Sequence, residues 1–530
     1  MKKPAIWILT LLFPFLSIAQ NSIEQWEVLD IPFELVYDNS VNPFDLHVEA
    51  YVKGNGESKL LPLFYNGGHQ WVLRFSSAKT GTYTFELVGN VKTKSKATGN
   101  IEVVANTKSD RHGGIVLNDI VKDRFFYEDG SHYFNLAFEC DWLFALDYGQ
   151  KELTKTEKLL NTLKENGLNQ IVMNVYAHDV VWEKDPLLAS HPEHEYGGKQ
   201  DIFPFLGTNE EPNFNSLNVN FFEHFDHVIA SMHEKEIASH LMIYVWNKMV
   251  NWPEMNSEAD NRYFDYVIKR YQAYPNMIWD ISKEALFYGR ATEEYILERI
   301  DRVRKLDKYD RLLSVHDFGF CSRNPEKVDF ISSQNWTGSL YHSALGMNEK
   351  FSNKPVLNIE HGGYEESPYV VFTGAYVNPE VCLRRNYACI FAGIYSTYYW
   401  QGTSWNVIIH NPLEQPDGFI KPKFEYYKHL RGFFEKFDFK DFSPYPKANS
   451  SGYCLKSSDS KTLLFYFPKE NWHIKLWSVL NENQGEISYQ FFNTITGEYT
   501  ESKIYEKKQG DGLKSPWYEE NDSILIINLK

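Results

Sequence analysis

The sequence predicts a multidomain chain in which a central (β/α)8 TIM barrel is flanked by an N-terminal and a C-terminal β-sandwich domain. Between about residues 106 and 440, apolar strand-like runs alternate with helical patterns eight times, which is the repeat of this barrel. The stretches on either side contain short strand patterns separated by turn residues, which is typical of β-sandwiches. We therefore expect domains at 22–105, 106–440 and 441–530, in a chain whose 530 residues exceed the usual size of one domain.

The first residues have the features of a secretory signal peptide. Lys2 and Lys3 provide a positive start, an apolar run follows from Ile6 to Ile18, and Ser17-Ile18-Ala19 offers small residues for cleavage. We expect residues 1–19 to be removed on export, which places the mature protein in the periplasm or outside the cell. No later stretch has the length and apolar character of a transmembrane segment.

Composition narrows the choice of partners and cofactors. The chain has 70 Asp and Glu against 54 Lys and Arg, a net charge of −16, which argues against nucleic acid as a partner. The number of cysteines, five, is odd and none forms a CxxC pair, so we expect most of them to be buried thiols and at least one to be free or paired between chains. No P-loop, GxGxxG or GxSxG pattern occurs in its required context, and we expect no metal and no other cofactor. Aromatic residues make up 16%, with 14 Trp; aromatic faces suit sugar rings, and they also suit large cores. The sequence carries no signature of an oligomeric state.

The N-terminal domain is predicted from alternation and turns. From Phe44 to Val52, apolar residues occupy every second position, which predicts a half-buried strand. Asn66-Gly67-Gly68 is a turn before a second strand at 71–75. Gly81 then opens a third run at 82–87, so short strands recur at the spacing of a sandwich.

The barrel is predicted from its strands and one well-marked helix. A capping box of Thr154 and Glu157 precedes an apolar stripe, and Gly167 ends the helix. A Pro-, Gly- and Asn-rich insertion at about 183–218 is long enough to be functional. The eight expected strands are Tyr133–Ala137, Ile171–Val175, Leu241–Val245, Met277–Ile281, Leu312–Val315, Phe330–Ser333, Val356–Ile359 and Gly393–Tyr398. In the C-terminal domain the expected strands are 462–467, 474–477, 487–492 and 524–529.

Polar and aromatic residues follow the expected barrel strands, where barrel enzymes place their active sites. This recurrence predicts a cleft that binds a polysaccharide or an oligosaccharide. We expect Trp142, Trp246, Trp336 and Trp400 to stack on sugar faces. The other predicted binding residues are Glu139, Asp141, Asn174, Tyr176, His178, Lys283, His316, Asn335 and Trp405.

Two carboxylates stand at the ends of strands four and seven, which lie across the barrel mouth from each other. Glu284 ends the run Trp279–Glu284, in which alternation places Asp280, Ser282 and Glu284 on one face. Glu360 ends the run Pro355–Glu360. Glycoside cleavage needs one carboxylic acid and a second carboxylate that attacks or activates water. The alternative is that both residues belong to unrelated salt bridges.

Two segments around these carboxylates resemble motifs of a known superfamily. Pro275–Glu284 looks like the strand-four motif, and Lys354–Gly362 like the strand-seven motif, of clan A retaining glycoside hydrolases. The resemblance implies that Glu284 is the acid/base and Glu360 the nucleophile. The barrel is similar to the apiosidase-like group. Trp26–Ile101 resembles the N-terminal β-sandwich domain of Bacteroidota polysaccharide-degrading proteins, and Phe491–Gly497 resembles part of a collagen-binding-like domain appended to such barrels.

Lys283 departs from the clan A pattern, which has Asn before the acid/base to bind the sugar 2-hydroxyl. Lysine is a cation and only a donor. One interpretation is an anionic sugar, uronate or sulfated, bound by Lys283 with help from His178, Arg290 or His316. The other is that Lys283 pairs with an acid such as Asp280 or Glu139. Either way, a cation beside Glu284 should change the pKa of that carboxyl.

These features favour a retaining glycoside hydrolase acting on a plant or algal polysaccharide or its oligosaccharides. The first alternative is a non-catalytic carbohydrate-binding protein on a degenerate TIM barrel, which the departure at Lys283 keeps open. The second is an exported metal-dependent hydrolase using the histidines of 191–195. That cluster lacks HExxH spacing, so a loop wall is the favoured interpretation.

Overall fold

The architecture comes from a computed structural model. The residues it describes are 21–38, 40–89, 92–179, 190, 202–246, 248–361, 378–400, 411–414, 420–449, 452–471, 474–475, 485–506 and 512–530. The expected signal peptide, the 191–195 cluster and Trp405 lie outside the described residues. None of the helices in the described parts combines the length and apolar character needed to cross a bilayer.

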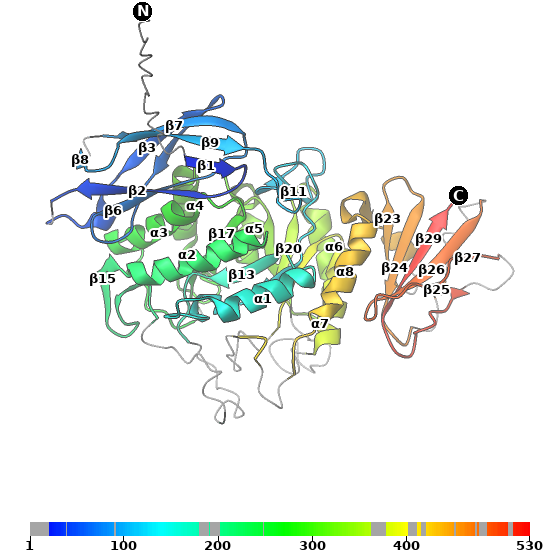
Figure 1. The fold of residues 1–530 in the computed structure, drawn as a ribbon. Coiled ribbons are helices and arrows are strands. Elements are labelled where there is room, and N and C mark those ends of the chain that lie inside the picture. The colour runs from blue at the N-terminus through cyan, green and yellow to red at the C-terminus, as the bar shows by residue number, and fades with distance from the viewer. Residues whose placement is uncertain are drawn as a thin grey trace, which may run out of the picture.

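An eight-stranded parallel sheet forms the barrel, in the order β18-β17-β16-β13-β12-β21-β20-β19 (Figure 1). Its strands are β12 (Ala137–Glu139), β13 (Gln170–Asn174), β16 (Ala238–Val245), β17 (Met277–Lys283), β18 (Leu313–His316), β19 (Ile331–Gln334), β20 (Val356–Glu360) and β21 (Tyr395–Tyr398). Seven neighbouring pairs are hydrogen-bonded, and β18 lies beside β19. The predicted fold class, a TIM barrel between two β domains, is confirmed.

Helices surround this sheet (Figure 1). Their buried apolar residues belong to the same hydrophobic core as those of the strands. They are α1 (Thr154–Glu165), α2 (Val219–Glu234), α3 (Glu258–Tyr271), α4 (Glu293–Leu306), α5 (Phe318–Arg323), α6 (Leu340–Lys350), α7 (Pro379–Phe391) and α8 (Glu425–Lys436). The predicted capping box of α1 is wrong. Leu153 is the N-cap residue and makes no side-chain cap bond, while the Asp147 carboxylate accepts the Thr156 amide at 2.8 Å. Gly167 ends the helix with φ +80°, as predicted.

The first barrel strand starts later than predicted, at Ala137 rather than Tyr133. The Tyr133 amide donates backward to the Phe125 carbonyl at 3.0 Å, next to the β10–β11 ribbon (Ile115–Leu117 and Phe125–Tyr127). An apolar run that pairs with a local ribbon cannot join the barrel until it leaves that partner. This shift places Glu139 at the last position of β12.

The N-terminal domain consists of two sheets. The first is β1 (Asn21–Glu24), β9 (Thr98–Val104), β7 (Gly81–Val88), β3 (Glu49–Gly54) and β4 (Glu57–Pro62); the second is β5 (Phe64–Tyr65), β6 (Gln70–Phe75), β2 (Leu29–Val36) and β8 (Lys92–Thr93). The predicted strand from Phe44 begins only at Glu49. Pro43 instead starts a 3-10 turn that the Asn42 side chain caps.

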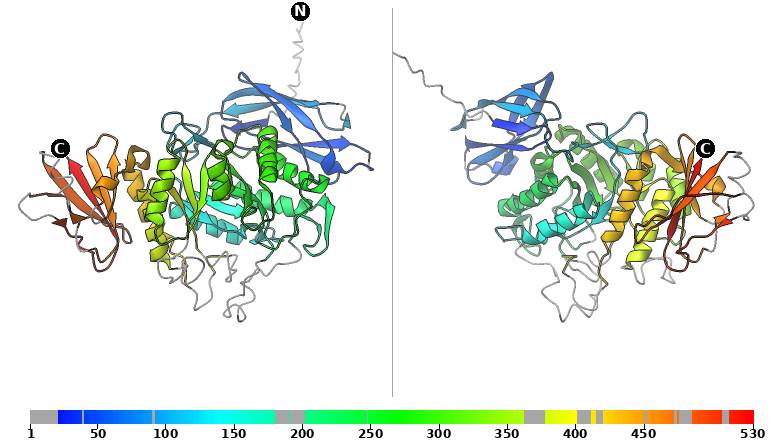
Figure 2. Two further views of the ribbon diagram at one scale, coloured as in Figure 1. Left: turned by 180° about the vertical axis from the view of Figure 1, so that it is seen from behind. Right: turned by 45° about the vertical axis from the view of Figure 1, so that its right-hand side comes forward.

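The C-terminal domain is a six-stranded antiparallel sheet with a small ribbon. The sheet runs β22 (Phe442–Pro444), β23 (Tyr453–Ser457), β24 (Thr462–Phe467), β29 (Ser523–Leu529), β26 (Ile487–Asn493) and β27 (Lys503–Ile504). The ribbon pairs β25 (Ile474–Lys475) with β28 (Gly512–Leu513). The two terminal domains attach to different sides of the barrel (Figure 2).

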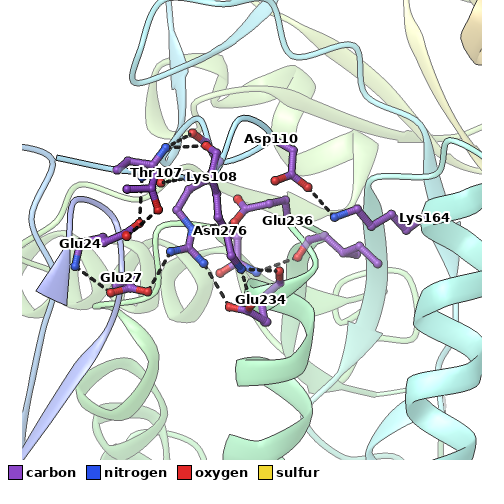
Figure 3. Close-up of polar contacts among 12 residues, drawn as sticks. Glu24, Glu27, Thr107, Lys108, Asp110, Lys164, Glu234, Glu236 and Asn276 are labelled. Carbon is purple, nitrogen blue, oxygen red and sulfur yellow. Dashed lines mark hydrogen bonds and ion pairs between the residues drawn. The ribbon is translucent and has the colours of Figure 1, made fainter.

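Charged residues join the N-terminal sandwich to the barrel (Figure 3). Arg111, in the connecting segment, pairs with Glu27 of the sandwich at 3.3 Å. It also pairs with Glu234 at 3.2 Å and Glu236 at 2.8 Å, at the end of α2. Lys108 adds an ion pair to Glu234. We call this set the Arg111 junction.

Candidate active site

Six barrel strands end in a polar side chain, and most of these side chains meet at the carboxyl end of the barrel. The terminal residues are Glu139 (β12), Asn174 (β13), Lys283 (β17), His316 (β18), Gln334 (β19) and Glu360 (β20). All except the half-buried Gln334 are buried. The strands are parallel and hydrogen-bonded to their neighbours, so their ends lie at the same level of the barrel.

Glu360 is held by donors on both carboxylate oxygens. Lys283 Nζ lies 2.6 Å from Oε1, and His316 Nε2 lies 3.4 Å from the same oxygen. Gln334 Nε2 donates to Oε2 at 2.7 Å. Burial and the nearby Lys283 charge lower the pKa of His316 to about 3, so His316 is neutral here. Glu360 is thus oriented by Lys283 and Gln334, and His316 packs against its Oε1.

Glu284 lies directly after β17 in a left-handed conformation, with φ +57°. This conformation is uncommon outside Gly, Asn and Asp, and it is often found at functional sites. Burial and the negative charge of Glu360 raise the pKa of Glu284 to about 7, while the charge of Lys283 and a hydrogen bond from Gln334 oppose that rise. Gln334 therefore interacts with both carboxyl groups. A buried carboxyl that keeps its proton near neutrality is suited to act as a general acid.

The strict alternation predicted for strand four does not hold at its end. The pairing of β17 with β18 is irregular between Asp280 and Lys283, and Glu284 turns into the left-handed region. In a regular strand, neighbouring residues point to opposite faces. Here the irregular register and the turn bring the consecutive residues Lys283 and Glu284 to the same group of side chains.

Lys283 is enclosed by acids. Its Nζ lies 2.5 Å from Glu139 Oε1, 2.6 Å from Glu360 Oε1 and 3.6 Å from Asp141 Oδ1. Although burial lowers it, the charges of Asp141, Glu139 and Glu360 raise the pKa of Lys283 well above its ordinary value. The predicted ion pair with Glu139 is therefore present. The alternative partner Asp280 instead faces His240 at 3.2 Å and accepts the His316 backbone amide at 2.9 Å.

A second buried ammonium lies beside the first. Lys248 Nζ is 3.2 Å from Asp141 Oδ2, and it lies 4.8 Å from the centre of the Trp142 ring. Asn174 Nδ2 donates to Asp141 Oδ1 at 3.1 Å. Burial lowers the pKa of Lys248. These contacts fix the position of Asp141 from two directions.

A pocket of about 290 Å³ opens next to Glu284. Its lining combines the acid with aromatic and polar groups: Glu284, Phe287, His316, Asp317, Phe318, Gly319, Gln334 and Trp336. Phe287 is 71% exposed and contacts the Tyr288 ring edge-on. Trp336 also contacts Tyr399 edge-on, at 5.1 Å between ring centres. The site thus has an aromatic-walled opening on the Glu284 side.

The predicted tryptophans do not share one role. Trp142 and Trp400 are packed in the barrel core, with 0% and 1% exposure, so we withdraw them as stacking surfaces. Trp246 is partly buried and stacks on Tyr244. Of the four, only Trp336 lines the pocket described above.

The side chains of three other predicted binding residues contact groups other than the two carboxyls. The Tyr176 hydroxyl contacts His178 Nδ1 at 3.2 Å, and its ring packs on Phe203. His178 Nε2 faces Glu210 at 3.2 Å. The Asn335 side chain accepts the Thr337 amide and hydroxyl, at 3.0 and 2.8 Å.

The predicted binding residues omit three groups that the structure brings to the site. Gln334 is the last residue of β19, and Tyr399 is the first residue after β21. Their position at strand ends could have predicted both from the sequence. Lys248 comes three residues after β16 and carries no such signal. Burial and the charges of Glu360 and Glu139 raise the pKa of Tyr399 well above its ordinary value.

The donor set does not resemble a metal site. Among the described residues, no group of three or more His, Cys, Asp or Glu side chains is arranged to hold a metal ion. The acids of the site face ammonium groups instead. All five cysteines are buried free thiols, as predicted.

Comparison with protein families gives two matches. Residues 121–439 match the family described as "Apiosidase-like, catalytic domain". Residues 22–90 match a domain of unknown function, DUF5060. No curated protein matches the chain.

Solved structures share the fold. A candidate glycoside hydrolase from Bacteroides vulgatus is 18% identical, with a TM-score of 0.75, over 96% of this chain and 100% of that one. A glycoside hydrolase family 5 protein from the same organism is 17% identical, with a TM-score of 0.54, over 79% and 94%. A third structure, described as a glycoside hydrolase, is 16% identical with a TM-score of 0.55, over 79% and 97%.

Proposed function

The chain belongs to the apiosidase-like family, and from that premise we propose that it is a retaining glycoside hydrolase with Glu360 as nucleophile and Glu284 as acid/base. The observation that carries this proposal is the pairing of unlike carboxyls. Glu284 keeps its proton to a pH of about 7, while Glu360 forms an ion pair with Lys283 through Oε1 and accepts a hydrogen bond from Gln334 on Oε2. Two carboxyl groups with such different environments divide the acid and nucleophile roles.

The reaction proceeds in two steps. A Glu360 oxygen attacks the anomeric carbon, and the bond to the leaving oxygen breaks while Glu284 gives that oxygen its proton. The product is a glycosyl ester on Glu360. Glu284, now ionised, takes a proton from water, and the water oxygen attacks the anomeric carbon and releases Glu360. A retaining mechanism requires the carboxyl groups to lie about 5 Å apart, which stays a prediction.

The arrangement of charges favours a neutral sugar at the reacting position. Lys283 is enclosed by three acids at 2.5 to 3.6 Å, and Lys248 pairs with Asp141 at 3.2 Å. Neither ammonium therefore presents an uncompensated positive charge to a uronate or a sulfate. The buried carboxylates balance these ammonium groups, so the region has no excess positive charge to attract an anionic substrate. We therefore prefer neutral glycans to the anionic sugar expected from Lys283.

The pocket beside Glu284 is the natural place for the leaving group. The acid must reach the departing oxygen, so the part of the substrate that leaves lies on the Glu284 side. Phe287 and Trp336 offer aromatic faces there. We expect a sugar or another ring in the leaving group to stack on these side chains.

The test is turnover of a panel of neutral and anionic polysaccharides and oligosaccharides by the purified chain. Proton NMR of the first product should show the same anomeric configuration as the substrate. Glu360→Gly should lose hydrolysis, and added azide should yield a glycosyl azide of inverted configuration. An initial product of inverted configuration would contradict the retaining mechanism.

The panel also separates the alternatives. A non-catalytic carbohydrate-binding protein would bind a glycan and leave it intact. A metal-dependent hydrolase would lose activity after treatment with chelator, whereas the proposed mechanism is unaffected.

A further inference from the structure

Lys283 lies at the centre of the buried acids. The two steps of the proposed reaction give it no role. It comes from β17, and its carboxyl partners come from β20 and from the end of β12. Its side chain is 2% exposed, and those of Glu139 and Glu360 are 0% and 2% exposed. One ammonium is therefore shared by two buried carboxyl groups.

The charges of the buried set decide which carboxyls are ionised. The set holds the carboxyl groups of Glu139, Asp141, Glu284 and Glu360 and the ammonium groups of Lys248 and Lys283. Uncompensated buried charge is costly. The set is neutral when two of the four carboxyl groups carry a proton.

Geometry assigns the two protons. Asp141 has its own ammonium in Lys248 and an amide donor in Asn174, at 3.2 and 3.1 Å. Glu360 has Lys283 on one oxygen and Gln334 on the other. Glu284 is the general acid and keeps its proton. The second proton therefore belongs on Glu139, which must share Lys283 with Glu360. Burial and the Glu360 charge also raise the pKa of Glu139 well above its ordinary value.

We propose that Lys283 is a positioning residue that keeps Glu360 ionised and aimed at the sugar, and that Glu139 supports Lys283 as a protonated, neutral carboxyl group. A neutral carboxyl still accepts a hydrogen bond from Lys283 and does not compete for its charge. This inference rests on the proposed function, because it takes Glu360 as the nucleophile.

Several groups besides Lys283 face Glu360 and bear on its ionisation. His316 from β18 is neutral, and Gln334 from β19 is an uncharged donor. Glu139 and Asp141 at β12, Glu284 after β17 and Tyr399 after β21 are acids, and Lys248 is the more distant cation. Lys283 is therefore the cation in direct contact with Glu360 among the described residues.

The first experiment compares Lys283→Met, Glu139→Gln and wild type by the pH dependence of kcat/KM on a substrate from the panel. Lys283→Met removes the cation that lies 2.6 Å from Glu360, so the acid limb of its pH profile should move up by about one unit or more. Its kcat/KM at neutral pH should fall about a hundredfold. Glu139→Gln should stay within about fivefold of wild type, because an amide oxygen accepts the same hydrogen bond.

Arg111→Met is the matched control, because it also removes a buried cation that faces three carboxyl groups. It should leave the acid limb in place. An unmoved acid limb in Lys283→Met would overturn the role of Lys283. A large loss in Glu139→Gln, with a moved limb, would overturn the neutral form of Glu139.

A second measurement needs no substrate. Carbon-13 NMR of protein labelled at the glutamate δ-carbon, with Glu139→Gln and Glu360→Gln to assign signals, should show at pH 7 a protonated Glu139 and an ionised Glu360. An ionised Glu139 at pH 7 overturns the inference even when Lys283→Met does not fold. Failure of the proposed function has a different signature: wild type without turnover on any glycan, or Glu360→Gln fully active.

Discussion

Arg111 and Lys283 are both buried cations that face three carboxyl groups. The two sites differ in how far these carboxyl groups are exposed to water. At the Arg111 junction, Glu27 and Glu234 remain 38% and 62% exposed, and Glu236 is 12% exposed. Around Lys283 the three acids are 0 to 2% exposed. Water therefore stabilises the excess charge at the junction and is excluded from it at the site.

The choice of cation follows from this difference. Arginine has five donors in a fixed fork and can serve several carboxylates at once, which suits a junction that ties two domains. Lysine carries a compact charge that can lie close to one oxygen of each of two carboxyl groups. At the junction the contacts are structural, whereas around Lys283 proton positions can be set for chemistry. Four substitutions sharpen or break this contrast.

The largest effect is expected from Glu360→Gln. Removal of the proposed nucleophile should lower turnover by about a thousandfold or more, because an amide cannot form the glycosyl ester that Glu360 forms. The fold should persist, since Gln keeps the shape and the contact with Gln334. Turnover on the active glycan and circular dichroism measure the two results. A variant with more than a tenth of wild-type activity would remove Glu360 as the nucleophile.

Glu284→Gln should show that the buried, ionised form of Glu284 lowers the free energy of unfolding above neutral pH. The folded-state pKa of Glu284 is raised from 4.5 to about 7. The stabilisation from its bound proton is complete below about pH 4.5 and is lost as the pH rises through 7. Above pH 8, Glu284→Gln should therefore be more stable than wild type by up to about 3 kcal/mol relative to the difference at pH 4. Denaturant unfolding at both pH values tests this; equal differences would contradict it.

Glu284 should also determine the basic limb of the pH profile of kcat/KM. Glu284 must carry a proton for the first step, so kcat/KM should fall as the pH rises through about 7. In Glu284→Gln this limb should disappear from the residual activity on substrates with good leaving groups. A limb that persists in the variant belongs to another group.

Arg111→Met should act on stability alone. Three carboxylates lose their shared partner, but two of them keep water, so the cost should be about 1 to 3 kcal/mol. Thermal unfolding measures this loss, and kcat per folded molecule should equal that of wild type. A change in kcat would mean that the junction communicates with the barrel site.

The smallest effect is expected from Lys164→Ala, at the edge of the same junction (Figure 3). Lys164 pairs with Asp110 at 2.6 Å, and the two side chains are 43% and 52% exposed. Such surface pairs contribute little, so stability should change by less than about 0.5 kcal/mol. A larger loss would show that exposed pairs also support the domain contact.

Pattern and period predicted most of the fold. Val356 to Ile359 and Met277 to Ile281 are short, mostly apolar runs typical of buried parallel strands, and they lie in β20 and β17. The errors fell where a local contact competes with the long-range one. Pro43 starts a turn inside an alternating run, and Tyr133 pairs with a ribbon before the barrel begins.

For the site, the sequence by itself determined that Glu284 and Glu360 follow strands four and seven, because strand order and period place them at one end of the barrel. It also determined that a lysine precedes Glu284. The tertiary structure alone decided where that lysine points, since the irregular pairing of β17 and the left-handed Glu284 turn both residues inward. It also decided that Trp142 and Trp400 belong to the core and that Lys248 and Gln334 join the acids. The physical reason is that the period of a strand or helix decides on which face a side chain lies. The partners of that side chain depend on strands brought together from distant parts of the chain.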